Sequence, residues 1–207
     1  MKKIFHPLKI LICLMVIALS FASCSKKENG AEPTIDPKNE LNYNNETYSL
    51  NYGGFRNGGF NGTHINYEFH IFKFISENDP IVPIYLYLNL YSPNEDGFKG
   101  GTFTFADEEE DVEGTYYFNE AYLIHNMNIT DETAEDIVYV KGGKVNVSGK
   151  GTKFNLEFEL VTDNDKTITG SYGGNFEPIN ATNAKVQGQV KGKSSPPRNF
   201  IIPFIKQ

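Results

Sequence analysis

The chain has 207 residues, enough for one domain of ordinary size that buries its own core without disulfides or metals. Its net charge is −7, which argues against a nucleic-acid or anionic-membrane surface. Sixteen Phe and twelve Tyr with no Trp indicate a β-rich, aromatic core, and the only two cysteines, Cys13 and Cys24, lie in or just after an amino-terminal apolar segment. A folded part without thiols suits an oxidising exterior.

The amino terminus has the pattern of a secretory signal. Lys2 and Lys3 are basic, residues 8–22 form an apolar run too short for a typical transmembrane helix, and small residues follow. We therefore expect residues 1–23 to be a signal peptide.

The end of this segment, Phe21-Ala22-Ser23-Cys24, resembles the lipobox of bacterial lipoprotein signals. Phe21 stands where Leu is usual, a departure tolerated in lipoproteins of the Bacteroidetes type. The resemblance implies that Cys24 carries a diacylglycerol and an N-acyl chain such as palmitate, which suffices for stable anchoring. It places the protein on the outer membrane, at the cell surface or the periplasmic face; the alternative is a secreted protein with a chance cysteine.

Residues 24–45 have no apolar periodicity and are rich in Pro, Asn and charge. This composition predicts a flexible leash between the lipid and a single domain over residues 46–207. Within that domain, residues 47–52 are a plausible first strand, and the glycine-rich residues 53–62 are typical of a loop or turn.

The clearest pattern lies in residues 142–179, which predict three antiparallel strands joined by tight turns. Phe154, Leu156, Phe158 and Leu160 alternate with polar residues, as in a sheet with one buried face. Gly149 and Gly151 mark the first turn and residues 163–165 the second. Because the apolar face of this meander needs a covering layer, we expect an all-β, two-layer antiparallel β-sandwich, with a partly closed β-barrel as the alternative.

The remaining segments give further strands. Residues 64–75, 84–91, 100–105, 114–125 and 137–140 alternate, and residues 184–190 and 199–205 are expected to close the fold. Residues 130–136 predict a single helical turn capped by Thr130.

Two strands carry candidate ligand-binding side chains. His64, Glu68 and His70 share one face, which we interpret as solvated, since one strand rarely completes a metal site. In residues 84–91 the leucines face the core, whereas Tyr85, Tyr87 and Tyr91 share the opposite face. That tyrosine face is either packed or an exposed floor for sugar rings, and these three tyrosines are the candidate ligand-binding residues.

The acidic run at residues 107–113 has six carboxylates in seven residues. A calcium site would need a shaped loop, and the spacing does not match an EF-hand, so a solvated loop is expected; calcium binding stays an alternative. No metal site, cofactor or catalytic residue is predicted. Adjacent carboxylates do not make a glycosidase pair, and no nucleophile elbow or His-Glu-x-x-His motif is present.

The strand Gly101-Thr102-Phe103-Thr104-Phe105, followed by the meander with Val145, Phe154, Ile168, Gly170 and Tyr172, resembles outer-membrane lipoproteins of the Bacteroidetes type. The resemblance implies a β-sandwich on a lipid anchor and brings no catalytic residue with it. We therefore expect a non-enzymatic cell-envelope binding module, for extracellular glycans and not for nucleic acid. The alternative is a structural or adhesive surface protein, similar to a pilin or an adhesin, that acts through protein contacts.

Overall fold

The computed structural model describes residues 32–76, 79–93, 96–107, 114–128, 130, 133–179 and 189–190. The chain divides into two units, Met1–Ala31 and Glu32–Gln207, and all described residues belong to the second. The signal peptide, Cys24, most of the acidic run and the expected strand at 199–205 lie outside the described residues. Among those described, no helix has the length and apolarity to cross a membrane.

The described residues form strands and connecting segments, with no helix. The strands are β1 (Glu40–Tyr43), β2 (Glu46–Ser49), β3 (Tyr52–Asn61), β4 (His64–Phe72), β5 (Ile81–Ser92), β6 (Gly101–Phe105), β7 (Tyr117–Asn128), β8 (Thr133–Ala134), β9 (Asp136–Lys150), β10 (Lys153–Thr162), β11 (Thr167–Asn175), β12 (Glu177–Pro178) and β13 (Gln189–Val190).

All these strands belong to one hydrogen-bonded sheet that is not closed into a barrel. Its order is β12-β3-β4-β5-β7-β6-β9-β10-β11-β1-β2, while β8 pairs with β7 and β13 pairs with β8. The all-β prediction is confirmed. The pairing is mostly antiparallel, but β6–β7, β12–β3 and β13–β8 are parallel, so the sheet is mixed.

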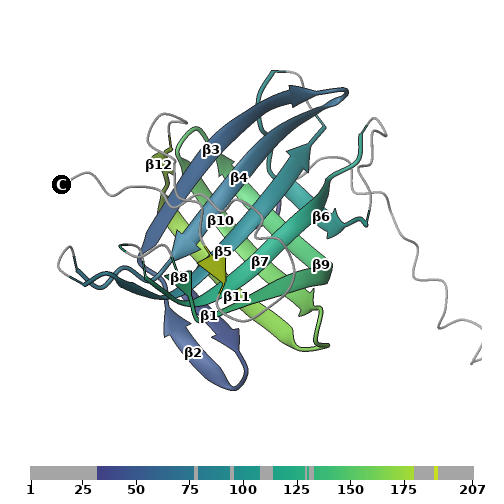
Figure 1. Ribbon diagram of the computed structural model, residues 1–207. Helices are drawn as coiled ribbons and strands as arrows, with labels where there is room; N and C mark the ends of the chain where they lie inside the picture. Colours follow the sequence, from purple (N-terminus) through teal and green to yellow (C-terminus); the bar gives the residue numbers. More distant parts are fainter. Residues whose placement is uncertain are drawn as a thin grey trace, which may run out of the picture. The chain divides into compact units, whose positions relative to one another are not determined.

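Two halves of this sheet pack on each other and form the layers of the sandwich. In Figure 1 the strands β3, β4, β5 and β7 lie side by side in one layer, and the green strands β9, β10 and β11 cross behind them. The core between the halves contains the fully buried Phe69, Leu88, Phe118, Leu156 and Phe158. Both halves therefore present their alternate residues to one shared core, as the period-2 pattern requires.

The meander is formed as predicted. β10 pairs with β9 on one side and β11 on the other, and Phe154, Leu156, Phe158 and Leu160 are all buried. The first turn comes two residues later than expected, because Lys150 still pairs with Lys153. Asp165 has a φ of 62° in the second turn, a conformation that Asp tolerates.

Three segments differ from their predicted structure. The glycine-rich residues are a strand, β3, where Gly53 lets the chain pack against Tyr172 and Phe176. The leash ends earlier than residue 45, because β1 pairs with β11 and buries Leu41. The expected helical turn is replaced at Thr133–Ala134 by β8, which pairs with β7.

Gly170 allows β1 to pair closely with β11. A Cβ on Gly170 would overlap the backbone oxygen of Glu40 and lie 2.9 Å from the Phe158 ring. We expect Gly170→Ala to lower the free energy of unfolding by about 1–3 kcal/mol, because a strand backbone cannot move aside as a side chain can. Gly142→Ala is the control, since its Cβ would meet only Val161 at 3.7 Å. Equal denaturation midpoints for the two variants would contradict this expectation.

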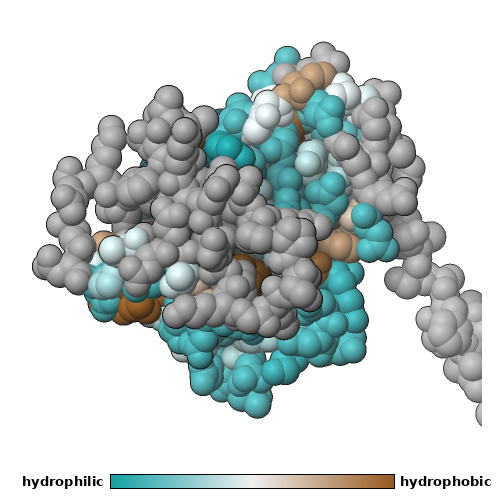
Figure 2. Space-filling model, viewed as in Figure 1, coloured by the Kyte–Doolittle hydropathy of each residue, from teal (hydrophilic) through white to brown (hydrophobic). Residues whose placement is uncertain are grey.

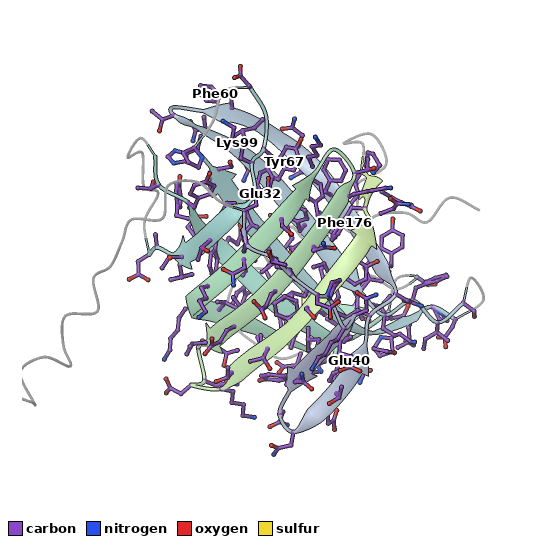
Figure 3. All side chains as sticks on the ribbon, turned by 180° about the vertical axis from the view of Figure 1, so that it is seen from behind. Glu32, Glu40, Phe60, Tyr67, Lys99 and Phe176 are labelled. Carbon is purple, nitrogen blue, oxygen red and sulfur yellow. The ribbon has the colours of Figure 1, made fainter. Side chains whose placement is uncertain are left out.

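The described surface is largely polar. On the side seen in Figure 2, the described residues are mainly hydrophilic, and hydrophobic residues form small patches. Figure 3 shows the other side, with Glu40 on β1, Phe176 beyond the end of β11, and Phe60 at the tip of the β3–β4 hairpin. Phe60 is half exposed and isolated, and single exposed apolar residues are ordinary.

Candidate functional site

The outward side of β3, β4, β5 and β7, called here the outer face, combines aromatic and polar residues in rows across the strands. One row, called here the polar row, runs from Arg56 through Glu68 and Asn89 to Glu120. Aromatic residues lie on both sides of it. On one side Tyr87 stacks on Tyr122 at 4.6 Å between ring centroids, and on the other Tyr91 stacks on Tyr117 at the same distance.

The structure places the three predicted tyrosines on this outer face, opposite the leucines of β5 as expected. Leu86, Leu88 and Leu90 are fully buried in the core between the layers. Tyr85 and Tyr87 are not an exposed row, however, because they are buried at 0% and 7% exposure in a second apolar cluster. Tyr91 is half-buried. Their role in ligand binding stays a prediction.

The expectation of a solvated His and Glu face is wrong. His64, Glu68 and His70 are exposed by only 1%, 6% and 0%. Alternation of apolar and polar residues along a strand predicts that the polar ones face solvent. Here neighbouring aromatic and polar side chains enclose His64, Glu68 and His70. Among the described residues, no group of three or more His, Cys, Asp or Glu side chains is arranged to hold a metal.

Glu68 is the centre of a buried polar network. The Arg56 guanidinium donates two hydrogen bonds to its carboxylate, one from Nε at 2.8 Å and a second from Nη2. On the other side, His70 Nε2 lies 3.9 Å from Glu68 Oε2. The Nδ1 atom of His70 is hydrogen-bonded to the Tyr85 hydroxyl at 2.5 Å. Arg56 thus balances the charge of Glu68, and the hydrogen bond with the Tyr85 hydroxyl fixes the orientation of the His70 ring.

The environment of His70 favours the neutral imidazole. Burial, together with the positive charge of Arg56, lowers the pKa of His70 to about 3. The same burial raises the pKa values of Tyr85 and Tyr87, so that both stay protonated. At neutral pH the network therefore contains one ion pair and uncharged neighbours.

A β-bulge in β3 shapes the edge of this network. The register with β4 shifts between Asn57 and Gly59, and Gly58 is the extra residue. A Cβ on Gly58 would overlap the Asn66 side-chain oxygen, so only glycine leaves room for Asn66. Asn66 in turn donates to Asn89. Bulges occur often beside functional sites because they redirect side chains.

A cavity of about 520 Å³ adjoins these residues. Its volume lies in the range of small-molecule sites. The lining residues are Phe55, Arg56, Asn57, Gly58, Asn66, Glu68, Pro178 and Ile179.

A second hollow of about 390 Å³ lies over the other half of the sheet. Its wall is formed by exposed carboxylates and lysines, among them Glu157, Glu159 and Lys144, and its floor by short residues of β11. Lys144 is only 3.4 Å from Glu159, but both are more than half exposed. Ion pairs of this kind are common on solvated surfaces and contribute little. The cavity beside Arg56 and Glu68 is therefore the stronger candidate.

No family model, curated protein or solved structure matches the chain. The functional assignment therefore depends on geometry. Sequence reasoning identified the outer-face tyrosines and placed Asn66, Glu68 and His70 on one face, but it missed Arg56 and the cavity. One signal could have pointed to the bulge: the pair Asn57-Gly58 lies just before a strand with alternating polar residues. The glycine-rich segment that contains this pair was instead predicted to be a loop.

Proposed function

We propose that this protein is a lipid-anchored binding module of the cell envelope that takes a neutral, hydroxyl-rich ligand, such as an extracellular glycan, without catalysis. The observation that supports it most is the polar row, with Glu68 and Asn89 buried at its centre, beside the 520 Å³ cavity. The Glu68 carboxylate is largely buried and the Arg56 side chain is 28% exposed. An ion pair with a buried partner is seldom more stabilising than apolar residues of the same shape, so its presence suggests a role other than stability.

The chemistry of the cavity favours a neutral ligand. Arg56 is neutralised by its double hydrogen bond to Glu68, yet a guanidinium has five N–H donors and two of them are used there. The remaining donors suit hydroxyl and ether oxygens. Asn66 adds an amide group and Ile179 an apolar side chain, a combination that matches the mixed polarity of a sugar.

The network is not arranged for hydrolysis. Glycosidases need two carboxyl groups facing each other across the bond, with one of them kept protonated. Glu68 is held by Arg56 as its counter-ion, and the cavity lining contains no second carboxylate among the described residues. Binding is therefore the better-supported role. The anchor at Cys24 and the outer-membrane location remain part of the proposal, supported by the lipobox resemblance.

The alternative, assembly through an edge strand, is less supported. The two ends of the sheet path, β2 and β12, have four and two residues, and Glu46, Thr47 and Ser49 of β2 are polar and exposed. Short polar edges discourage the addition of a further strand.

Thermal unfolding with a panel of glucans, xylans, mannans, galactans and acidic polygalacturonate tests the proposal. A ligand at a hundred times its dissociation constant should add about 2.7 kcal/mol to the free energy of unfolding and raise the midpoint. We expect a shift with a neutral glycan and none with polygalacturonate. Arg56→Gln should weaken binding at least tenfold, whereas Lys144→Gln, which breaks an ion pair on the other half, should not. No shift across the panel would refute the glycan assignment.

A further inference from the structure

His70 has a ring nitrogen whose environment is unusual for a buried group. Its Nε2 atom is fully buried and has no hydrogen-bond partner. Buried nitrogen and oxygen atoms nearly always have a partner, and an exception calls for a specific explanation. Nε2 points toward the Glu68 carboxylate but stays 3.9 Å from Oε2, too far for a direct hydrogen bond.

One bridging oxygen could span the separation of 3.9 Å, and because Nε2 is fully buried, this oxygen enters only when neighbouring side chains shift. An atom placed off the line between Nε2 and Oε2 can lie at hydrogen-bond distance, about 2.8 Å, from both. If the Tyr85 hydroxyl donates to Nδ1, the neutral ring carries its proton on Nε2, where it faces the negative carboxylate. The intervening oxygen must then accept from His70 and donate to Glu68.

We propose that the position between His70 Nε2 and Glu68 Oε2 binds one hydroxyl group of the ligand. A hydroxyl both accepts and donates, whereas a carbonyl or carboxylate cannot donate to Glu68 and an ammonium cannot accept from His70. This inference rests on the proposed glycan-binding function and assigns to it a specific anchoring position. An anchoring role would also explain why Glu68 and His70 are buried among aromatic residues.

The pair adjoins the cavity through Glu68, whereas His70 is not among the lining residues. Glu68 lines the cavity directly, and Gly54, the partner of His70 in β3, contributes no side chain. Ile179 packs over Gly54 and also lines the cavity. The anchored hydroxyl would thus belong to the end of a ligand whose remaining atoms lie beside Arg56 and Asn66.

The test uses the full-length chain, the methyl glycosides of glucose, galactose, mannose and xylose, and their monodeoxy analogues, with binding measured by calorimetry. For a glycoside that binds, we expect one monodeoxy analogue to bind at least tenfold more weakly. That analogue lacks the anchored hydroxyl, so His70 Nε2 and the Glu68 carboxylate are both left without this partner. Equal affinities for the parent and every monodeoxy analogue would overturn the inference and leave glycan binding intact.

Variants give an independent readout. His70→Phe should weaken binding of the same glycoside at least tenfold and abolish the discrimination against that monodeoxy analogue, while His70→Gln, which keeps an amide donor, should retain part of both. His125→Phe is the matched control, because His125 Nε2 is also buried without a partner but lies on the side of the β1–β2 hairpin, beside Tyr43 and Tyr48. Unchanged binding by folded His70→Phe would show that the position holds only a water. A wild-type protein that binds no glycan or glycoside would refute the proposed function and this inference with it.

Discussion

Phe69→Ala is expected to lower the free energy of unfolding by about 3–5 kcal/mol, the usual loss when a fully buried Phe is truncated. Phe69 lies on β4 with 0% exposure. Its ring makes edge-to-face contacts with Phe154 on β10 at 5.3 Å and with Phe176 after β11 at 5.5 Å. One side chain therefore joins the two layers of the sandwich, and its loss leaves a cavity that neither half can fill alone.

Urea denaturation of Phe69→Ala beside Phe60→Ala measures this contribution. Phe60 is 50% exposed at the tip of the hairpin, so the same chemical change there should alter stability by no more than about 0.5 kcal/mol. Phe69→Leu keeps most of the volume and should cost less than Phe69→Ala. Similar losses for Phe69→Ala and Phe60→Ala would mean that the layers do not pack as described.

The strands that sequence analysis predicted well share a simple property: each has one buried and one solvated face. β10 is the clearest case, because Phe154, Leu156, Phe158 and Leu160 are buried and the glutamates between them are exposed. The period-2 pattern records this asymmetry directly. The same period separated the tyrosines of β5 from its leucines, although both faces of that strand are buried.

The errors arose where both faces of a strand are enclosed or where glycine replaces side chains. On β4, burial of Glu68 and His70 depends on residues of two other strands, Arg56 on β3 and Tyr85 and Tyr87 on β5, which no local pattern connects. On β3 the glycines favour no structure by themselves. Their strand conformation is decided by Tyr172, Phe176 and Asn66, which need the space.

The candidate site could not be predicted because it depends on pairing register. Arg56 and Glu68 are twelve positions apart and meet only because the hairpin turns at residues 62–63 and a bulge at Gly58 adjusts the register. A one-residue shift would move Arg56 to face the core. The lipid anchor is the opposite case, since its prediction depends on a short local motif that needs no folded partner.

Acidification should destabilise the fold through His70 well before the carboxylates titrate. His70 is fully buried, and its pKa is lowered from 6.5 to about 3 by burial and by Arg56, with Glu68, Tyr85 and Tyr87 as its other close neighbours. Below pH 6.5 the unfolded chain binds a proton that the folded chain does not, so the stability present above pH 6.5 falls as the pH decreases toward 3. At pH 5 the loss is about 2 kcal/mol, at 1.36 kcal/mol for each pH unit.

The measurement is the free energy of unfolding between pH 7 and pH 5, for the wild type and for His70→Gln, which cannot titrate. The difference between their slopes isolates His70 from His125, whose pKa burial also lowers. Over this interval we expect the free energy of unfolding to fall by about 2 kcal/mol less in the variant than in the wild type. The reason is that an amide does not take up a proton when the chain unfolds. Parallel curves would mean that His70 is protonated in the folded protein, with Glu68 as its partner. In that case Nε2 would already be occupied by a direct ion pair, and the position assigned to a ligand hydroxyl would not exist.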